Sequence, residues 1–144
     1  MTTKEDQFNL NRFIEAQNDI YKQVLSELKN GKKQTHWMWF IFPQIDGLGR
    51  SPIAKYYAIK SEKEAKNYLA HALLGKRLQE CTETILKIDG LTASQIFGFP
   101  DNEKLKSSMT LFSSISKQDS PFHQVLLKYF EGKSDNKTLE ILQL

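Results

Sequence analysis

The sequence predicts an all-α protein, a compact single-domain bundle of about seven or eight short helices over residues 1–144. Three observations carry this prediction. Apolar residues recur at the i, i+3, i+4, i+7 spacing of a helix face. Ser, Thr or Asp precede most of these stretches and Gly follows several of them, as helix caps do. No two segments alternate as paired strands do, and no linker or repeat divides a chain of ordinary domain length.

The first predicted helix covers residues 10–28, with Asn9 as its expected N-cap and Gly31 as its stop. Large apolar side chains line one face: Leu10, Phe13, Ile14, Ile20, Tyr21, Val24, Leu25 and Leu28. Gln17 is the one polar interruption. Because a buried amide needs hydrogen-bond partners, Gln17 either ties down a neighbouring loop or faces a ligand, and the structural tie is the favoured interpretation.

The stretch "THWMWFIFPQ", residues 35–44, holds both tryptophans and predicts a short helix through Phe42. Thr35 is its expected cap, and Pro43 would stop it. Trp, Phe and Ile also favour strands, but no second strand-like segment is available for pairing, so a helix is preferred. Residues 43–52 contain two prolines and two glycines and predict a turn-rich loop.

Start and stop signals predict six further helices. Ser61 and Glu64 have the spacing of a capping box, and Ser120-Pro121 puts proline at a first helical position. The expected ranges are 61–69, 73–88 ended by Gly90, 92–97 capped by Thr92, 101–115 capped by Asp101, 121–130 ended by Gly132, and 135–142 capped by Asp135.

Composition is typical of a soluble globular protein, with 40% apolar and 26% charged residues. Cys81 is the only cysteine, so an intramolecular disulfide is impossible. The polar start, Met1–Asp6, has no apolar run like that of a signal peptide. The longest apolar run, Trp37–Phe42, is too short to cross a bilayer. We therefore expect a cytoplasmic protein without a membrane partner.

Charge is distributed unevenly along a chain whose net charge is +3. Residues 29–60 hold six basic residues and one acidic residue. This excess suits an anionic ligand and equally suits solvated surface lysines. The histidines and the cysteine lack zinc spacing, and the sequence has no P-loop, dinucleotide or GxSxG motif. No metal or cofactor is predicted, and the low net charge argues against a dedicated nucleic-acid binder.

The candidate site is centred on residues 35–51. Trp37 and Trp39 are two positions apart, so on a helix they face about 160° from one another, and one can be core while the other lines a groove. His36 falls in the expected first turn and is the candidate general acid or base. A structural cap or a surface histidine is the alternative interpretation of His36.

Polar residues downstream supply candidate ligand contacts, beginning with Gln44. Gly49, Arg50 and Ser51 combine backbone N–H groups, a guanidinium and a hydroxyl in a possible cradle for phosphate or carboxylate. Pairing of Arg50 with Asp46 or with a helix C-terminus explains the arginine comparably well.

A second polar group lies on the predicted 101–115 helix: Lys106, Ser107 and Thr110. Hydroxyl side chains in mid-helix need partners. If this face meets the Arg50 loop, the two groups form a cationic pocket, and otherwise they form a solvated stripe. Arg77 is a third possible anion contact, whereas Cys81 reads as an inert core thiol.

Several stretches resemble a known bacterial family, domain of unknown function 1810. They are "RFIEAQ", "THWMWFIFPQIDGLGRS", "YAI", "EAKNYLAHALLGKRLQEC", "IFGFPDNEKLKSSMTLF" and "TLEIL". The resemblance covers roughly residues 7–143 and implies a compact all-helical fold, without implying an activity. The family pattern falls on His36, Trp37, Trp39, Pro43, Gln44, Gly47, Gly49, Arg50, Ser51, Lys106, Ser107, Met109 and Thr110. Some members carry a calpastatin label, which conflicts with this sequence because that inhibitor is a long disordered chain.

Three hypotheses about function follow. The first is an enzyme, or an inactive relative, that handles a small anionic metabolite such as a nucleotide or a phosphorylated or ADP-ribosyl compound. In it His36 is the acid or base, Arg50 and Lys106 bind the anion, and a tryptophan is the stacking wall. The second is a non-catalytic module that binds a peptide, a partner helix or a small ligand in an exposed tryptophan groove. The third is that residues 35–51 are core packing and function lies elsewhere. The sequence leaves enzymatic activity and oligomeric state open.

Overall fold

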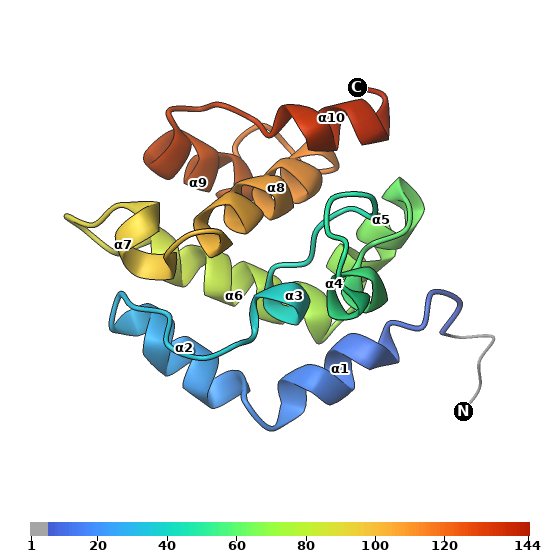
Figure 1. Ribbon diagram of the computed structural model, residues 1–144, viewed down its shortest axis with the longest axis horizontal. Helices are drawn as coiled ribbons and strands as arrows, with labels where there is room; N and C mark the ends of the chain where they lie inside the picture. Colours follow the sequence, from blue (N-terminus) through green and yellow to red (C-terminus); the bar gives the residue numbers. More distant parts are fainter. Residues whose placement is uncertain (1–5) are drawn as a thin grey trace.

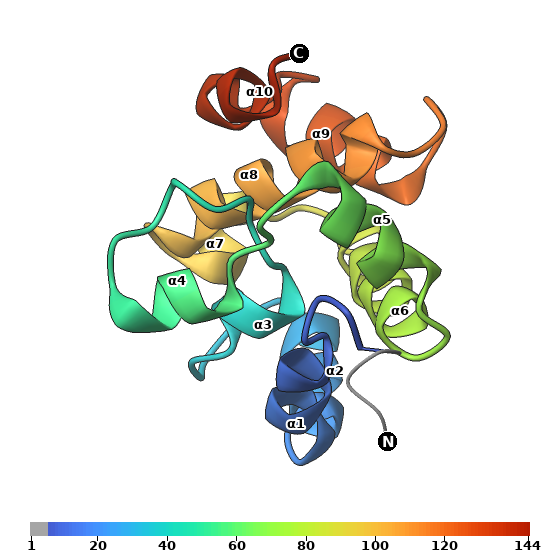
Figure 2. The same cartoon turned by 90° about the vertical axis from the view of Figure 1, so that its right-hand side faces the viewer.

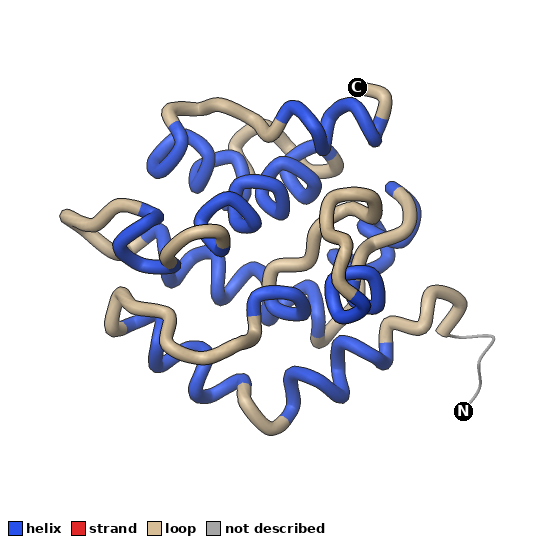
Figure 3. Tube along the Cα trace, viewed as in Figure 1, coloured by secondary structure: helices blue, strands red, loops and turns tan. Residues whose placement is uncertain are grey.

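Ten helices occur in residues 6–144, the range that the computed structural model describes (Figures 1 and 3). They are α1 (Asn11–Asn18), α2 (Tyr21–Lys29), α3 (Met38–Ile41), α4 (Pro52–Tyr57), α5 (Glu62–Ala70), α6 (Leu74–Leu86), α7 (Ala93–Phe97), α8 (Asp101–Ser114), α9 (Pro121–Phe130) and α10 (Asn136–Leu142). Within this range one parallel bridge, Ile45 to Ile59, is the only β pairing. The all-α class is confirmed. Residues 1–5, which include most of the polar N-terminal stretch and the predicted domain start, lie outside the described range.

The helices form a stack from one end of the molecule to the other (Figures 1 and 2). Helices α1 and α2 form a V at one end, and α9 and α10 lie at the other. Helix α6 runs between them and packs against α2, α5 and α9, while α8 packs against α5, α7, α9 and α10. The short helices α3 and α4 pack against each other, and α3 also packs against α1. The segment of the candidate site therefore lies on one side of the central helices.

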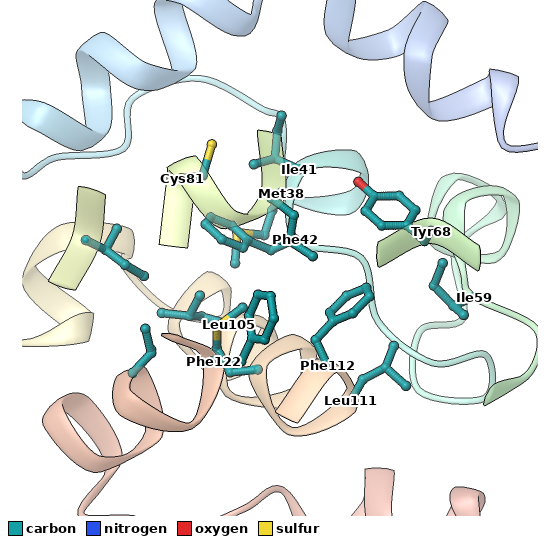
Figure 4. Packing of buried hydrophobic residues seen from close by; sticks show 14 of the residues in the cluster. Met38, Ile41, Phe42, Ile59, Tyr68, Cys81, Leu105, Leu111, Phe112 and Phe122 are labelled. Carbon is teal, nitrogen blue, oxygen red and sulfur yellow. The ribbon is translucent and has the colours of Figure 1, made fainter. Parts of the chain in front are cut away.

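One buried hydrophobic cluster takes side chains from eight of the helices, and partly buried residues of α4 (Tyr57) and α10 (Leu142) pack against it. In Figure 4, Met38 and Phe42 from the tryptophan-containing segment lie among side chains of α5, α6, α8 and α9. The aromatic ring of Phe112 lies 5.6 Å from that of Tyr68 and 5.8 Å from that of Phe122, measured between centroids. Because aromatic rings bury large areas, this chain of rings contributes heavily to the core.

The predicted 10–28 helix is wrong in one respect, because the chain turns between α1 and α2. Ile20 donates its N–H to the carbonyl of Gln17, a tighter i→i−3 closure. The break falls after Asn18 and Asp19, two residues with poor helix propensity whose side chains compete for backbone groups. The expected structural role of Gln17 is confirmed: its amide donates to the Phe40 carbonyl at 2.7 Å and to the Tyr68 hydroxyl at 3.2 Å.

Helix α4 was not expected, because the sequence predicts a loop over residues 43–52 and the next helix only from residue 61. Ser51 caps this helix by accepting a hydrogen bond from the Ala54 N–H at 3.2 Å, and Pro52 takes the first helical position. The split of the first helix and the addition of α4 explain why ten helices occur where seven or eight were expected.

The tryptophan-containing helix is shorter than predicted and begins at Met38. Thr35 is not its cap, because both its N–H and its hydroxyl donate to the carboxylate of Glu27. His36 therefore precedes the helix instead of occupying its first turn.

Most other caps are as predicted, with two exceptions. The side chains of Ser61, Thr92, Ser120 and Asp135 accept hydrogen bonds from the backbone at the starts of α5, α7, α9 and α10. Asn9 does not cap α1, since the Asp6 carboxylate accepts the Leu10 and Asn11 N–H groups instead. Asp101 does not cap α8, because it lies in the first turn and forms ion pairs with two lysines.

Across residues 6–144, every helix is too short or too polar to span a membrane.

Candidate functional site

Trp37 lies in the core, with 1% of its surface exposed. Its indole N–H donates to the buried carboxylate of Glu27 at 2.9 Å. The same carboxylate accepts the N–H groups of Gln34 (2.7 Å) and Thr35 (3.1 Å), the Thr35 hydroxyl (2.7 Å) and the Gln23 amide (3.0 Å). Burial alone would raise the pKa of Glu27, but these hydrogen bonds lower it to about 2. Trp37 is thus anchored inside the protein and has no surface to offer a ligand.

Trp39 is partly exposed and shares a small hollow with Gln44 and Gly49, two other residues predicted for the site. Tyr57 of α4 also lines this hollow. The ammonium of Lys104, from the first turn of α8, lies 4.9 Å from the Trp39 ring centroid. The structure therefore brings Trp39, Gln44 and Gly49 together and places the Lys104 ammonium beside the Trp39 ring.

The hollow has a volume of about 10 Å³, close to the room that one water molecule needs. Gly49 contributes to this tightness, because a Cβ there would lie 2.5 Å from the Ala54 side chain. The loop and α4 are therefore in direct contact. The hollow is therefore too small to enclose a ligand.

The remaining polar residues of the segment are at the surface. His36 and Arg50 are exposed, and neither side chain forms a hydrogen bond or ion pair with residues in the described range. Asp46 pairs with Lys60 at 3.6 Å, so it is not the partner of Arg50. Ser51 uses its hydroxyl to cap α4.

Ser107 and Thr110 hold the start of α10 in place. The Ser107 hydroxyl donates to the Asp135 carboxylate at 3.1 Å, and the Asp135 N–H donates to the Thr110 hydroxyl at 2.9 Å. These hydroxyl groups have structural partners, as mid-helix serine and threonine require. Lys106 is partly exposed, and it is Lys104 that reaches the tryptophan.

Asp101 joins two cation–π pairs that involve the two tryptophans. Its carboxylate lies 2.8 Å from the Lys33 ammonium and 3.6 Å from that of Lys104. Lys33 in turn lies 5.0 Å from the Trp37 ring centroid. Because the two ammonium groups share one carboxylate, the loop before α3 is fastened to the start of α8.

A larger cleft lies beside α4, and its residues were not singled out in the sequence. It has a volume of about 320 Å³ and is lined by Phe8, Asn9, Arg12, Lys55, Tyr56 and Lys60. Tyr56 is 53% exposed, and its ring meets that of Tyr57 edge-on at 4.8 Å. Lys55 and Lys60 belong to the basic stretch 29–60, so the uneven charge of the chain is the sequence feature that could have indicated this cleft. The sequence could not indicate the aromatic wall of the cleft, because Phe8 and Tyr56 are far apart in the chain.

Arg12 forms the buried base of this cleft. Its guanidinium donates to the carbonyls of Phe8, Asn9, Tyr56 and Ala58 and to the Glu64 carboxylate, which it approaches to 2.7 Å. These bonds use all five guanidinium donors. Arg12 thus fixes the walls of the cleft without having a donor left for a ligand.

The other titratable candidates have structural surroundings. Arg77 donates to the side-chain oxygens of Gln17 and Asn18. The His71 ring nitrogen Nδ1 accepts the N–H groups of Leu73 and Leu74. Burial raises the pKa of the Cys81 thiol to about 12, so it stays protonated and unreactive. Within the described residues, no cluster of three or more His, Cys, Asp or Glu side chains could hold a metal ion.

Comparison with known proteins gives one family and one solved structure. A family model described as a protein of unknown function (DUF1810) matches residues 7–142. The chain is 46% identical to the conserved hypothetical protein Rv1873 from Mycobacterium tuberculosis. The alignment with its crystal structure covers 96% of this chain and 99% of that chain, with a TM-score of 0.94. A search of curated proteins finds no match.

Proposed function

We propose that this chain, which belongs to the DUF1810 family, binds a small anionic ligand that carries a planar ring. The observation that carries this proposal is the cleft beside α4, which combines two aromatic side chains with two lysines. Its volume of about 320 Å³ lies at the lower end of the range of small-molecule sites. An anionic ligand is also one of the two interpretations of the basic excess of residues 29–60.

The aromatic walls provide the ring contact. Phe8 is partly buried, and Tyr56 is half exposed with one side fixed against Tyr57. A planar ligand that packs on Tyr56 gains a stacking contact with a ring that is already positioned. Because little side-chain freedom is lost, this contact favours binding.

The anionic group of the ligand would meet Lys55, Lys60 and Asn9. Lys60 pairs with Asp46 at 3.6 Å, but both side chains are about half exposed, so this pair is weak and replaceable. Lys55 forms no ion pair with the described residues, and the Asn9 side chain is exposed. Two ammonium groups and an amide suit a phosphate or carboxylate.

Binding fits the cleft better than catalysis does. The six lining residues include no histidine, cysteine, serine or carboxylate. The lining side chains that can act as acids, bases or nucleophiles are the two lysines and Tyr56, which we assign to contacts with the anion and the ring. His36 has no hydrogen-bond partner among the described residues that would orient its imidazole.

A second location for the same ligand is the mouth of the Trp39 hollow. Trp39, Gln44 and Gly49 line the hollow, and the Lys104 ammonium lies 4.9 Å from the Trp39 ring centroid. Arg50 follows Gly49 directly and is exposed. An anion held at this mouth would depend on Arg50 and Trp39, whereas an anion in the cleft would depend on Lys55 and Tyr56.

Calorimetric titration with adenosine monophosphate, phenyl phosphate, benzoate and inorganic phosphate tests the proposal. We expect a ring-bearing anion to bind more tightly than inorganic phosphate, and Tyr56→Leu or Lys55→Met to weaken it by about tenfold. Lys117→Met, which changes an exposed lysine in the α8–α9 loop, should have no effect. Loss of binding in Arg50→Met but not in Tyr56→Leu would move the site to the Trp39 hollow. No binding of any of the four compounds would refute both locations.

A further inference from the structure

We infer that the outer face of α2 and the adjoining α6–α7 loop form a docking groove for an acidic peptide that inserts one apolar side chain. The groove consists of two adjoining cavities and shares no residue with the cleft beside α4. In Figure 1, the end of α2 and the loop between α6 and α7 lie on the same side of the molecule.

The first cavity provides a pocket with an apolar floor. It has a volume of about 340 Å³ and is lined by Lys29, Asn30, Gly31, Thr84, Lys87, Ile88, Asp89 and Leu91. Leu91 packs so closely on the backbone of Gly31 that a Cβ there would lie 2.9 Å from its Cδ1 atom. Leu91 remains 37% exposed and Ile88 partly exposed, so the floor can receive an apolar side chain.

The second cavity extends the first along α2. It has a volume of about 420 Å³ and is lined by Lys22, Leu25, Ser26, Lys29 and Asn30, of which the last two also line the first cavity. Residues 22, 25, 26 and 29 follow the i, i+3, i+4, i+7 spacing of one helix face. At a rise of 1.5 Å per residue, Lys22 and Lys29 lie about 10 Å apart along the helix axis. This elongated shape fits several residues of an extended chain better than a compact small molecule.

The groove has an excess of unpaired positive charge. Lys22, Lys29 and Lys87 are exposed, and none forms an ion pair or side-chain hydrogen bond with the residues that the structure describes. Asp89 is the one acidic lining residue, and it lies 3.8 Å from the ammonium of Lys128. By contrast, Lys33 and Lys104 share the carboxylate of Asp101. Acidic side chains on a partner would therefore complement this face.

The helix ends at the groove also suit a peptide backbone. The carbonyls of Lys29, the last residue of α2, of Asn30, which follows it, and of Lys87, which follows α6, accept no hydrogen bond from the described residues. A peptide can donate its N–H groups to such carbonyls, which a simple polyanion cannot do. Acidic side chains, backbone donors and one apolar anchor are together the features of a peptide ligand.

Selection from a library of short peptides that carry Asp and Glu around one varied apolar residue tests this inference. We expect enriched peptides to bind wild-type protein and to lose about tenfold or more in affinity for Lys29→Glu or Lys87→Glu. Leu91→Ser should weaken the preference for a large apolar residue while leaving the preference for acidic residues. Lys76→Glu, which makes the same charge change at an exposed position of α6, is the matched control.

Titration of wild-type protein with an enriched peptide, followed by amide chemical shifts, locates the binding site without any variant. The shifts should cluster in residues 22–31 and 84–91. Equal affinity for Lys29→Glu and Lys76→Glu, no enrichment over a library in which lysine replaces the acids, or shifts elsewhere would overturn the inference. Equal competition by a single-stranded oligonucleotide would also overturn it, because the face would then be a general polyanion surface.

Discussion

Glu27 shows how one buried side chain decides the course of a neighbouring segment. Its carboxylate accepts five hydrogen bonds, and four of them come from residues 34–37. These bonds hold Thr35 and Trp37 in the conformation that precedes α3. A carboxylate can be buried only if its charge is compensated by such donors. The position of Trp37 therefore depends on a residue ten positions earlier.

The first prediction concerns Glu27 and pH. Because its pKa is about 2 in the folded protein against an ordinary value of 4.5, the unfolded chain binds the proton first as the pH falls. The stabilisation by Glu27 is therefore complete above pH 4.5 and is lost between about pH 4.5 and pH 2. This loss amounts to about 3 kcal/mol in the free energy of unfolding. Urea unfolding at several pH values measures it.

Glu27→Gln isolates this contribution from that of other carboxylates. At pH 7 the variant should be destabilised by about 2 kcal/mol, because an amide nitrogen then faces donors. The difference in the free energy of unfolding between wild type and Glu27→Gln should become smaller as the pH falls toward 2. Glu83→Gln, at an exposed position of α6, should show no such convergence. If this difference in the free energy of unfolding stayed constant across the pH range, the acid-dependent loss of stability would not come from Glu27.

The division of the two tryptophans was predictable only in part. Their spacing showed that one could be core and the other exposed. It could not show which, because that depends on where the helix begins. Thr35 looks like an N-cap in the sequence, but its hydroxyl donates to Glu27, so α3 begins at Met38. Local capping signals cannot reveal a competing partner in another helix.

At the scale of elements, start signals were more informative than the apolar pattern. Ser120-Pro121 correctly predicted α9, and the same pair at Ser51-Pro52 starts the unpredicted α4. The signal for α4 was thus present but was masked by the surrounding glycines and prolines. Conversely, an unbroken apolar pattern over residues 10–28 concealed the turn after Asn18. The buried apolar residues of α1 and α2 continue the same helical spacing across the turn. The cleft beside α4 could not be anticipated without that helix.

The second prediction concerns the contact between α5 and α6. Gly75 in the first turn of α6 is buried, and a Cβ there would lie 2.0 Å from the backbone oxygen of Leu69. Because a helix backbone would have to move, Gly75→Ala should destabilise the protein by about 3 kcal/mol. Gly90→Ala is the matched control. A Cβ at Gly90 would have open space, and only its φ of +79° would cost about 1 kcal/mol. Thermal unfolding followed by circular dichroism measures the loss in each variant. Equal losses would contradict the predicted clash at Gly75, because Gly75 lies within α6 and has no positive φ to strain an alanine.

At the scale of the whole molecule, polar side chains of α1 attach one end of the stack to the rest. Gln17 contacts Phe40 and Tyr68, while Arg12 contacts Glu64 and the segment around Tyr56. An eight-residue helix is not stable alone and depends on such tertiary contacts. The sequence indicated a structural role for Gln17. It does not indicate a structural role for Arg12, because arginine is mostly exposed and is buried only where it is paired.

The third prediction concerns the pair formed by Arg12 and Glu64, whose side chains are 5% and 1% exposed. Arg12→Met should cost about 3–5 kcal/mol, because it strands a buried carboxylate and leaves four carbonyls without a donor. Glu64→Gln should cost less, about 2 kcal/mol, since an amide can still accept from the guanidinium and Arg12 keeps its carbonyl partners. Lys66→Met, which removes the exposed Lys66–Glu62 pair, should change the free energy of unfolding by less than about 0.5 kcal/mol. Urea titrations give the order of the three variants. If Glu64→Gln were as damaging as Arg12→Met, the ion pair alone would account for the attachment of α1, and the four carbonyl contacts would contribute nothing measurable.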